Sequence, residues 1–162
     1  MRIEISIPAQ TLRLYDAQDV LLREYPVSTA LNGVGEEKNS FRTPRGPHII
    51  RAKIGAGQAC GTVFRARRTT GEIWTPELHA QHPGRDWILS RILWLSGCVP
   101  GFNRLGNVDS MQRYIYIHGA PDNAQEPFGA PHSHGCVRMH NRDVIELFDL
   151  VPLYTPVIIQ HD

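Results

Sequence analysis

The chain has 162 residues, of which 41% are hydrophobic and 20% charged, and its formal net charge is +1. This length is enough to bury a core, the composition is that of an ordinary globular protein, and no stretch approaches the ~18 apolar residues of a membrane span. A charge this close to zero gives no general attraction to nucleic acid or to an anionic membrane, so neither is an expected partner.

The first part of the chain predicts three strands. Hydrophobic and polar residues alternate over residues 3–7, 12–14 and 21–27, with turn-forming residues between these runs. This is the pattern of an antiparallel meander. Glu4 interrupts what would otherwise be the apolar segment of a signal peptide. We therefore expect a cytoplasmic protein, or a periplasmic one if a leader precedes this sequence.

The middle of the chain predicts further strands. A polar loop ends at the turn Thr43-Pro44-Arg45-Gly46-Pro47, and residues 48–54 follow as a strand. Residues 55–71 are rich in glycine and include Arg65, Arg67 and Arg68. We interpret them as a solvated loop or edge strand, the alternative being a cationic rim that attracts a substrate carboxylate. Residues 86–95 predict a buried strand or strand pair, with a short helix as the alternative.

The last part combines strands with a helix. Residues 114–118 alternate cleanly, which places Tyr114, Tyr116 and His118 on one face of a strand. Asn141 is the expected cap of a helix over residues 142–151, and a closing strand follows at residues 157–159. The pattern predicts a mainly β fold in a single domain spanning residues 1–162, with at least one helix after the loop at residues 132–136.

Three cysteines, at positions 60, 98 and 136, form an odd set without metal-type spacing, which argues against a disulfide scaffold. Cys60 and Cys98 are expected to be small buried residues. Cys136 differs because it follows a glycine in the run His132-Ser133-His134-Gly135-Cys136-Val137-Arg138-Met139. A thiol with a pKa of about 8.5 is mostly protonated at neutral pH and needs a base to become a nucleophile. No cofactor is implied by this chemistry.

His118 is the expected base because a strand end fixes its position by sheet hydrogen bonding. Its second ring nitrogen needs an acceptor, and the backbone carbonyl of Gly119 is the expected one. Gly135 permits a sharp turn that aims the N–H groups of Gly135 and Cys136 at one point, as an oxyanion hole requires. His132 and His140 are interpreted as loop or surface histidines.

These residues form a recognisable signature. His118-Gly119, followed by Ser133-His134-Gly135-Cys136-Val137-Arg138, resembles the signature of the L,D-transpeptidase (YkuD-type) catalytic domain, and Thr43-Pro44-Arg45-Gly46 resembles that family's early Thr-Pro-x-Gly turn. The resemblance implies a β-sandwich-like mixed fold and a cysteine enzyme. Its expected partners are peptidoglycan stem peptides, cut between an L-centre, often of diaminopimelate, and a terminal D-alanine.

The resemblance also implies residue roles. Cys136 is the nucleophile, His118 the base, and the Gly119 carbonyl orients that base. Ser133, His134 and Gly135 shape the oxyanion loop together with the cysteine. Arg138 supports the loop or the substrate carboxylate. Independently of the resemblance, Tyr116 is expected to bind substrate, because a groove lined by tyrosines suits a peptide. For Arg138 the alternative is a bracing ion pair with Asp143 or Glu146, and for Tyr116 it is a place in the core or rim.

Hydrolysis is the outcome that the sequence favours, because a cytoplasmic enzyme meets recycled tetrapeptide fragments and water. The protein is then an L,D-carboxypeptidase, and the alternative is an L,D-transpeptidase that cross-links stem peptides or exchanges D-amino acids. Two other classes stay open: a zinc site made by His118, His132, His134 and Cys136, and a non-catalytic β-sandwich that binds peptide or glycan. The pattern does not set the oligomeric state.

Overall fold

The computed structural model describes residues 1–122 and 126–162, and this part of the chain is mainly β, as the sequence predicts. Ten strands form within the described residues: β1 (Arg2–Ser6), β2 (Thr11–Tyr15), β3 (Leu21–Ser28), β4 (Gly46–Ile54), β5 (Thr62–Arg65), β6 (Arg68–Ile73), β7 (Ile88–Gly97), β8 (Tyr116–Gly119), β9 (Val137–Met139) and β10 (Pro156–Gln160). They are joined by the helices α1 (Pro76–Gln81) and α2 (Asn141–Leu150), and by one 3-10 turn at Gly106–Val108.

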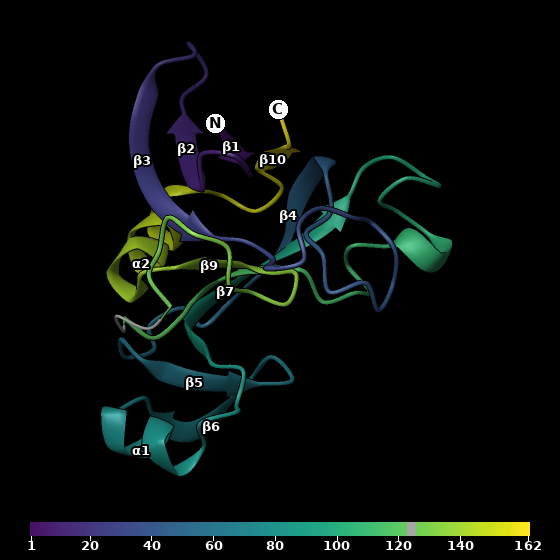
Figure 1. The fold of residues 1–162 in the computed structure, drawn as a ribbon. Coiled ribbons are helices and arrows are strands. Elements are labelled where there is room, and N and C mark those ends of the chain that lie inside the picture. Colours follow the sequence, from purple (N-terminus) through teal and green to yellow (C-terminus); the bar gives the residue numbers. More distant parts are fainter. Residues whose placement is uncertain (123–125) are drawn as a thin grey trace.

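The strands pair in the order β4-β10-β1-β2-β3-β9-β8-β7-β5-β6, and β4 also pairs with β7. Eight strands therefore form a closed ring of pairings, from which β5 and β6 extend. The pairs β1–β10 and β8–β9 are parallel, and the remaining pairs are antiparallel. Figure 1 shows β5, β6 and α1 at the end of the molecule opposite the two termini. The expected meander is present as β1–β3, and residues 86–95 contribute to a strand, β7.

The hydrophobic core lies between the sheet and α2. The inward residues of the meander, among them Ile3 and Leu12, are fully buried in one cluster with Val144 and Leu147 of the helix. Lys53 of β4 donates its ammonium to the carbonyl oxygens of Phe148 and Val151, at 2.6 and 2.7 Å. These carbonyls at the end of α2 lack helical partners, so the lysine both satisfies them and fastens the helix to the sheet.

The start of α2 differs from the expectation. His140 occupies the cap position without a side-chain hydrogen bond, and Asn141 is the first helical residue. The buried Asn141 side chain instead donates to Ala120 O at 3.0 Å and accepts from Ser90 Oγ at 2.6 Å. A buried amide satisfied at both ends ties the helix to β7 and to the chain after β8. Asn141 therefore links the helix to the sheet and does not cap the helix.

Helix α1 and the exposure of two cysteines were not anticipated. Thr75 caps α1 by accepting from the Leu78 N–H at 3.0 Å, but six residues are too few to give a periodic hydrophobic pattern. Cys60 and Cys98 are exposed, contrary to the expectation that they are buried. Both lie just outside strands, on connecting segments that run over the surface.

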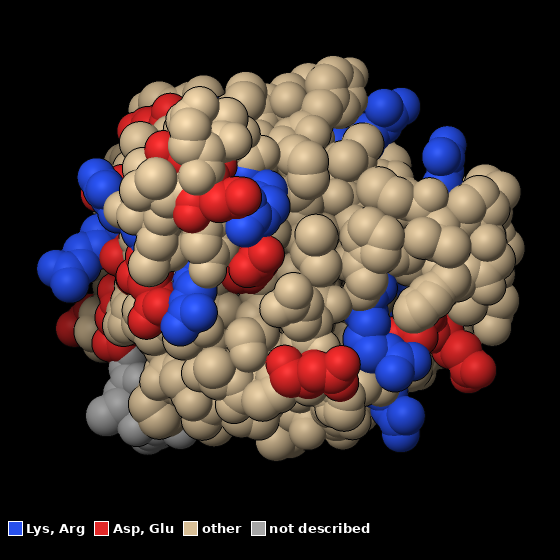
Figure 2. Space-filling view, turned by 90° about the horizontal axis from the view of Figure 1, so that it is seen from above, with Lys and Arg blue, Asp and Glu red and all other residues tan. Residues whose placement is uncertain are grey.

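The surface carries charges of both signs. Figure 2 shows acidic and basic side chains interspersed over the face in view, in keeping with the small net charge. Across the described ranges, no helix has the length and apolar character that a membrane crossing requires.

The core packing predicts a large difference between two leucines. Leu12 is 0% exposed and Leu31 is 67% exposed. Replacing Leu12 by Ala removes buried methyl groups and leaves a cavity, so Leu12→Ala is expected to lower the free energy of unfolding by about 2–5 kcal/mol. Leu31→Ala, the matched control, is expected to change it by less than ~0.5 kcal/mol. Urea denaturation measures both, and equal losses would contradict this description of the core.

Candidate active site

The parallel pairing of β8 with β9 brings the signature residues to one face of the sheet. His118 lies opposite Arg138, and Ile117 lies opposite Val137. Cys136 precedes Arg138 by two residues, so its side chain points to the same side as Arg138 and His118. Ile117 and Val137 point the other way into the core, where both are fully buried. The alternation thus separates the face that carries His118, Cys136 and Arg138, which we call the chemical face, from the face that packs into the core.

A cavity of about 300 Å³ lies on the chemical face. Six of the side chains expected at the site line it: Tyr116, His118, Ser133, His134, Cys136 and Arg138. Gly119 and Gly135 are not among the lining residues, and their carbonyl oxygens bind His118 and Thr43 instead. Six further residues line it: Ala66, Arg67, Asp86, Ile88, Arg113 and Tyr114. Of these, the sequence indicated only Arg67, as part of the alternative cationic rim, and Tyr114, as a neighbour of Tyr116 and His118. The cavity is therefore lined by β8, β9, the loop before β9 and the tip of the β5–β6 hairpin, among other segments.

His118 is buried and oriented by its neighbour. Its Nδ1 lies 2.6 Å from Gly119 O, the acceptor expected for that nitrogen. Because a carbonyl only accepts, Nδ1 carries the proton and Nε2 is left to receive another. A Cβ at position 119 would lie 2.5 Å from Leu89 O, so only glycine fits there. Burial lowers the pKa of His118 below its ordinary value of 6.5, which keeps the ring neutral at pH 7.

Cys136 is a half-buried thiol held between two backbone groups. Its Sγ donates to Tyr114 O and accepts from the Tyr116 N–H, each at 3.3 Å. Burial raises the pKa of this thiol to about 12, because the anion is poorly solvated. Within the described residues the structure records no hydrogen bond from the sulfur to His118, although both line the cavity. At neutral pH the thiol is therefore protonated, and it would need a base to act as a nucleophile.

The loop before Cys136 is fixed by two hydroxyl groups. Ser133 Oγ donates to Cys136 O at 2.5 Å and accepts from the Gly135 N–H at 3.2 Å. The Gly135 N–H expected to serve the oxyanion hole is therefore engaged within the loop here. Thr43 Oγ1 donates to Gly135 O at 2.9 Å and accepts from the Ala30 N–H at 2.9 Å. The early Thr-Pro-x-Gly turn thus acts as a clamp on the cysteine loop.

Glycine is required at position 135 for two reasons. Its φ of +132° lies in a region that other residues avoid, and a Cβ there would approach Arg42 O to 3.2 Å. Gly135 therefore lets the loop turn closely beside the segment that carries Thr43.

Arg138 and Arg113 are engaged with protein groups. Arg138 forms ion pairs with Asp86 at 3.2 Å and Glu126 at 3.0 Å. The bracing pair expected with Asp143 or Glu146 is wrong, since those residues belong to α2 and Arg138 faces the cavity. Arg113 donates to Arg42 O at 2.7 Å, to Gly35 O at 3.2 Å and to Ser40 Oγ at 3.3 Å. No local pattern marked Arg113, because it lies in an irregular segment.

The hairpin arginines divide into two kinds. Arg65 and Arg68 are exposed, in agreement with the solvated interpretation of this segment. Arg67 departs from it, because its side chain lines the cavity and donates to Tyr116 Oη at 3.1 Å. Tyr116 itself is buried and connects two parts of the site, since its backbone N–H contacts the sulfur.

The zinc-site alternative finds no support in the described part of the chain, where no group of three or more His, Cys, Asp or Glu side chains is arranged to hold a metal ion. His132 does not line the cavity, and its Nε2 is buried without a partner among the described residues. His140 lies 2.5 Å from Asp122 through Nδ1. These two histidines belong to the loop and the surface, as interpreted from the sequence.

The match to known sequences extends over nearly the whole chain. Residues 1–159 match the family model YkuD, described as the L,D-transpeptidase catalytic domain. The candidate L,D-transpeptidase YkuD of Bacillus licheniformis is 30% identical over 158 residues, covering 98% of this chain and 64% of that protein. The candidate L,D-transpeptidase YqjB of Bacillus subtilis is 46% identical over 50 residues, 31% of this chain and 27% of that protein. The chain thus spans less than two thirds of these relatives.

Solved structures share the fold. An L,D-transpeptidase from Mycobacterium smegmatis superposes with a TM-score of 0.53 at 22% identity, covering 98% of this chain and 57% of that one. L,D-transpeptidase 3 from Mycobacterium tuberculosis gives a TM-score of 0.58 at 16% identity, covering 99% of this chain and 60% of that one. At such identities the likeness concerns the fold alone.

The Thr43 clamp predicts a stability effect with a conservative control. Thr43→Val keeps the shape of the side chain but leaves the buried Ala30 N–H and Gly135 carbonyl without their partner. The expected loss in the free energy of unfolding is about 1–3 kcal/mol in urea denaturation. Thr43→Ser retains the hydroxyl and is expected to lose less. A valine variant as stable as the parent protein would contradict the clamp.

The raised thiol pKa predicts how Cys136 reacts with an alkylating agent. Cys60→Ser and Cys98→Ser remove the two exposed thiols, so that iodoacetamide labelling, followed by intact mass, reports Cys136 alone. Because the thiolate is the reactive form, the labelling rate is expected to rise with pH and to keep rising above the ordinary pKa of 9.0. A rate that is already maximal at pH 7 would instead show a preformed thiolate.

Proposed function

Because this chain belongs to the L,D-transpeptidase catalytic domain family, we propose that Cys136 forms a thioester with a peptidoglycan stem peptide and that water then releases it. The bond attacked lies between an L-centre and a terminal D-alanine, and the overall reaction is that of an L,D-carboxypeptidase. The observation that carries this proposal is the β8–β9 register, which places His118 and Cys136 in one cavity with the Gly119 carbonyl on the far side of the imidazole.

In the first half of the proposed reaction, His118 and Cys136 both start in their neutral forms. As the peptide enters, His118 Nε2 takes the proton from Cys136 Sγ, and the sulfur attacks the carbonyl carbon of the L-residue. The backbone N–H of Cys136 stabilises the oxyanion, and the Gly135 N–H joins it only by leaving Ser133 Oγ. Each such donor typically contributes ~3 kcal/mol. The carbon–nitrogen bond then breaks, and the amine of D-alanine leaves with the proton held by His118.

The second half restores the enzyme. A water molecule gives one proton to His118 as its oxygen attacks the thioester, and the carbon–sulfur bond breaks. The thiolate then recovers its proton from the imidazolium. The products are the shortened peptide with a new carboxyl group and free D-alanine, so one water molecule is consumed for each bond cut. Throughout, the Gly119 carbonyl keeps His118 in the tautomer that exchanges protons through Nε2.

Charge in the cavity supports water as the acceptor. Three arginines, Arg67, Arg113 and Arg138, line its wall, and Arg138 is paired with Asp86 and Glu126, so the described residues leave the wall with a net positive charge. An acceptor amine is an ammonium ion at neutral pH and is repelled by such a wall, whereas water is neutral. Transpeptidation, with an amine of a second stem peptide or a D-amino acid as acceptor, is the alternative outcome. The cytoplasmic location stays a prediction from the sequence.

Incubation with a disaccharide-tetrapeptide ending in D-alanine tests the proposal by mass spectrometry. The expected product has lost one alanine residue, while a dimer or an exchanged D-amino acid would indicate transpeptidation. Cys136→Ala is expected to reduce turnover at least ~10³-fold, because the thioester cannot form. Cys98→Ser, the matched control on an exposed cysteine, is expected to leave turnover unchanged. Absence of any product with reduced enzyme would refute the proposed function.

A further inference from the structure

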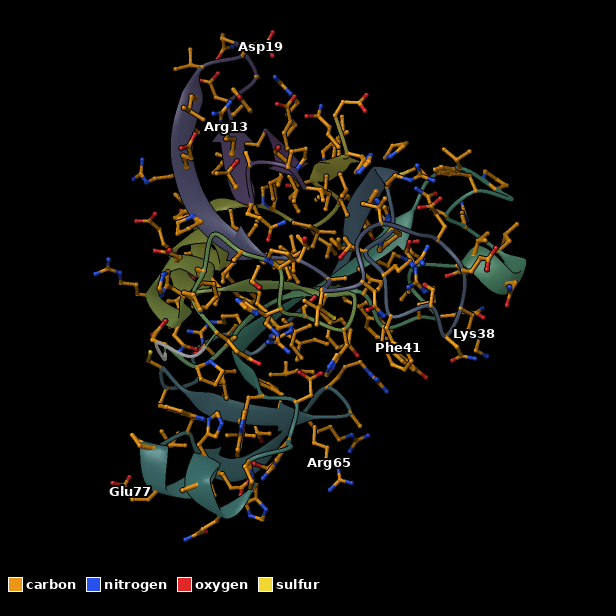
Figure 3. The ribbon with its side chains drawn as sticks, in the orientation of Figure 1. Arg13, Asp19, Lys38, Phe41, Arg65 and Glu77 are labelled. Atoms are coloured by element: carbon orange, nitrogen blue, oxygen red, sulfur yellow. The ribbon has the colours of Figure 1, made fainter. Side chains whose placement is uncertain are left out.

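We propose that Arg67 determines which acyl donor this cavity accepts, by binding a carboxylate of the donor close to the scissile bond. This inference rests on the proposed function and adds a specificity residue to it. Arg67 belongs to the β5–β6 hairpin, which contributes no residue to the signature of the site. Its neighbours Arg65 and Arg68 do not line the cavity, and Figure 3 shows Arg65 at the end of β5, at the periphery of the molecule.

Aromatic side chains hold the Arg67 guanidinium at the cavity wall. Its central carbon lies 4.8 Å from the ring centre of Tyr114 and 5.0 Å from that of Trp94. One N–H group donates to Tyr116 Oη at 3.1 Å. Stacking occupies the faces of a guanidinium and leaves its edge available, and five N–H donors are present in all. Arg67 is therefore held in place with donors to spare for a planar anion.

The hairpin backbone is strained at this residue. Ala66 and Arg67 have φ values of +47° and +63°, in the left-handed region that glycine and asparagine favour. A two-residue hairpin turn with both residues left-handed is normally built from Asn-Gly or a similar pair. Residues without this preference raise the energy of the turn, and such strain is typical of functional positions. We interpret the strained turn as the feature that directs the Arg67 side chain to the cavity.

The three arginines of the wall differ in the protein groups that they bind. Arg138 is paired with Asp86 and Glu126, and Arg113 donates to two backbone carbonyls and a serine hydroxyl. In the portion of the chain that the structure describes, no carboxylate forms an ion pair with Arg67. Among the described residues, Arg67 and Arg113 both lack a carboxylate partner, but Arg113 donates to three protein oxygens and Arg67 to one, so Arg67 has more donors left for an anion.

Tyr116 relates this cation to the reacting sulfur. Its backbone N–H lies 3.3 Å from Cys136 Sγ, and its hydroxyl oxygen lies 3.1 Å from Arg67 Nη1. One tyrosine side chain therefore spans the interval between sulfur and guanidinium, a length comparable with one or two residues of extended peptide. Two carboxylates of a diaminopimelate stem peptide lie on the residues that flank the scissile bond, one on the diaminopimelate side chain and one at the end of D-alanine. Arg67 is expected to bind one of them.

Three donors and two variants test the inference. The donors are a tetrapeptide with both carboxylates free, the same peptide amidated on the diaminopimelate side chain, and the same peptide ending in D-alaninamide. Arg67→Gln is expected to lower kcat/KM for the unmodified donor by about 10- to 100-fold, the range for a lost charge-assisted hydrogen bond. It is expected to have little effect on the donor that lacks the bound carboxylate, which identifies the carboxylate. Arg65→Gln is the matched control and is expected to affect no donor.

The same comparison in binding separates this inference from the proposed function. Dissociation constants are measured by calorimetry for the three donors in Cys136→Ala protein, with and without Arg67→Gln. An Arg67 effect that disappears with one amidated donor supports the inference even if the wild-type protein releases no D-alanine. An equal effect of Arg67→Gln on all three donors, no effect on any, or no binding of any donor would overturn it.

Discussion

The parallel pairing of β8 with β9 is the interaction on which the site depends. Since side chains alternate along a strand, the pairing that buries Ile117 and Val137 also places His118 and Arg138 in the cavity. A shift of one residue in either strand would reverse both faces, burying charged groups and exposing apolar ones. The core therefore enforces the register, and the register positions the base and the thiol. Stability and chemistry are linked here through the geometry of two short strands.

Short strands hold such a register only when their ends are fixed. At one end, Thr43 binds the carbonyl of Gly135 and so fixes the loop that precedes Cys136. At the other, Asn141 binds Ala120 O and Ser90 Oγ just beyond His118. Each contact satisfies buried polar groups whose isolation from water would otherwise be costly. The polar groups around the site thus serve a structural purpose, because they join the early turn, the sheet and α2.

The same burial sets the electrostatic state of the reacting pair. Removing the thiol and the imidazole from water raises the pKa of Cys136 and lowers that of His118, so both are neutral at pH 7. Charge enters the cavity mainly through arginines, two of which are already engaged with protein groups. In the proposed reaction, His118 transfers the protons and the hairpin recognises the donor. The two tasks come from separate elements that meet at Tyr116.

The fold class and the family of this protein were predictable from local sequence patterns. The alternation of residues 3–27 and 114–118, and the spacing of His118-Gly119 and Ser133 to Arg138, were sufficient to predict the meander, the mainly β fold and the family. Each of these features involves residues that lie close together in the sequence, so it can be recognised from the sequence alone. The position of Arg67 at the cavity, the partners of Arg138 and Arg113, the hydrogen bonds that link Asn141 to the sheet and the exposure of Cys60 and Cys98 were decided only in three dimensions. Each depends on contacts between residues far apart in the chain, such as Arg67 with Tyr116, and no local periodicity records which distant segments will meet.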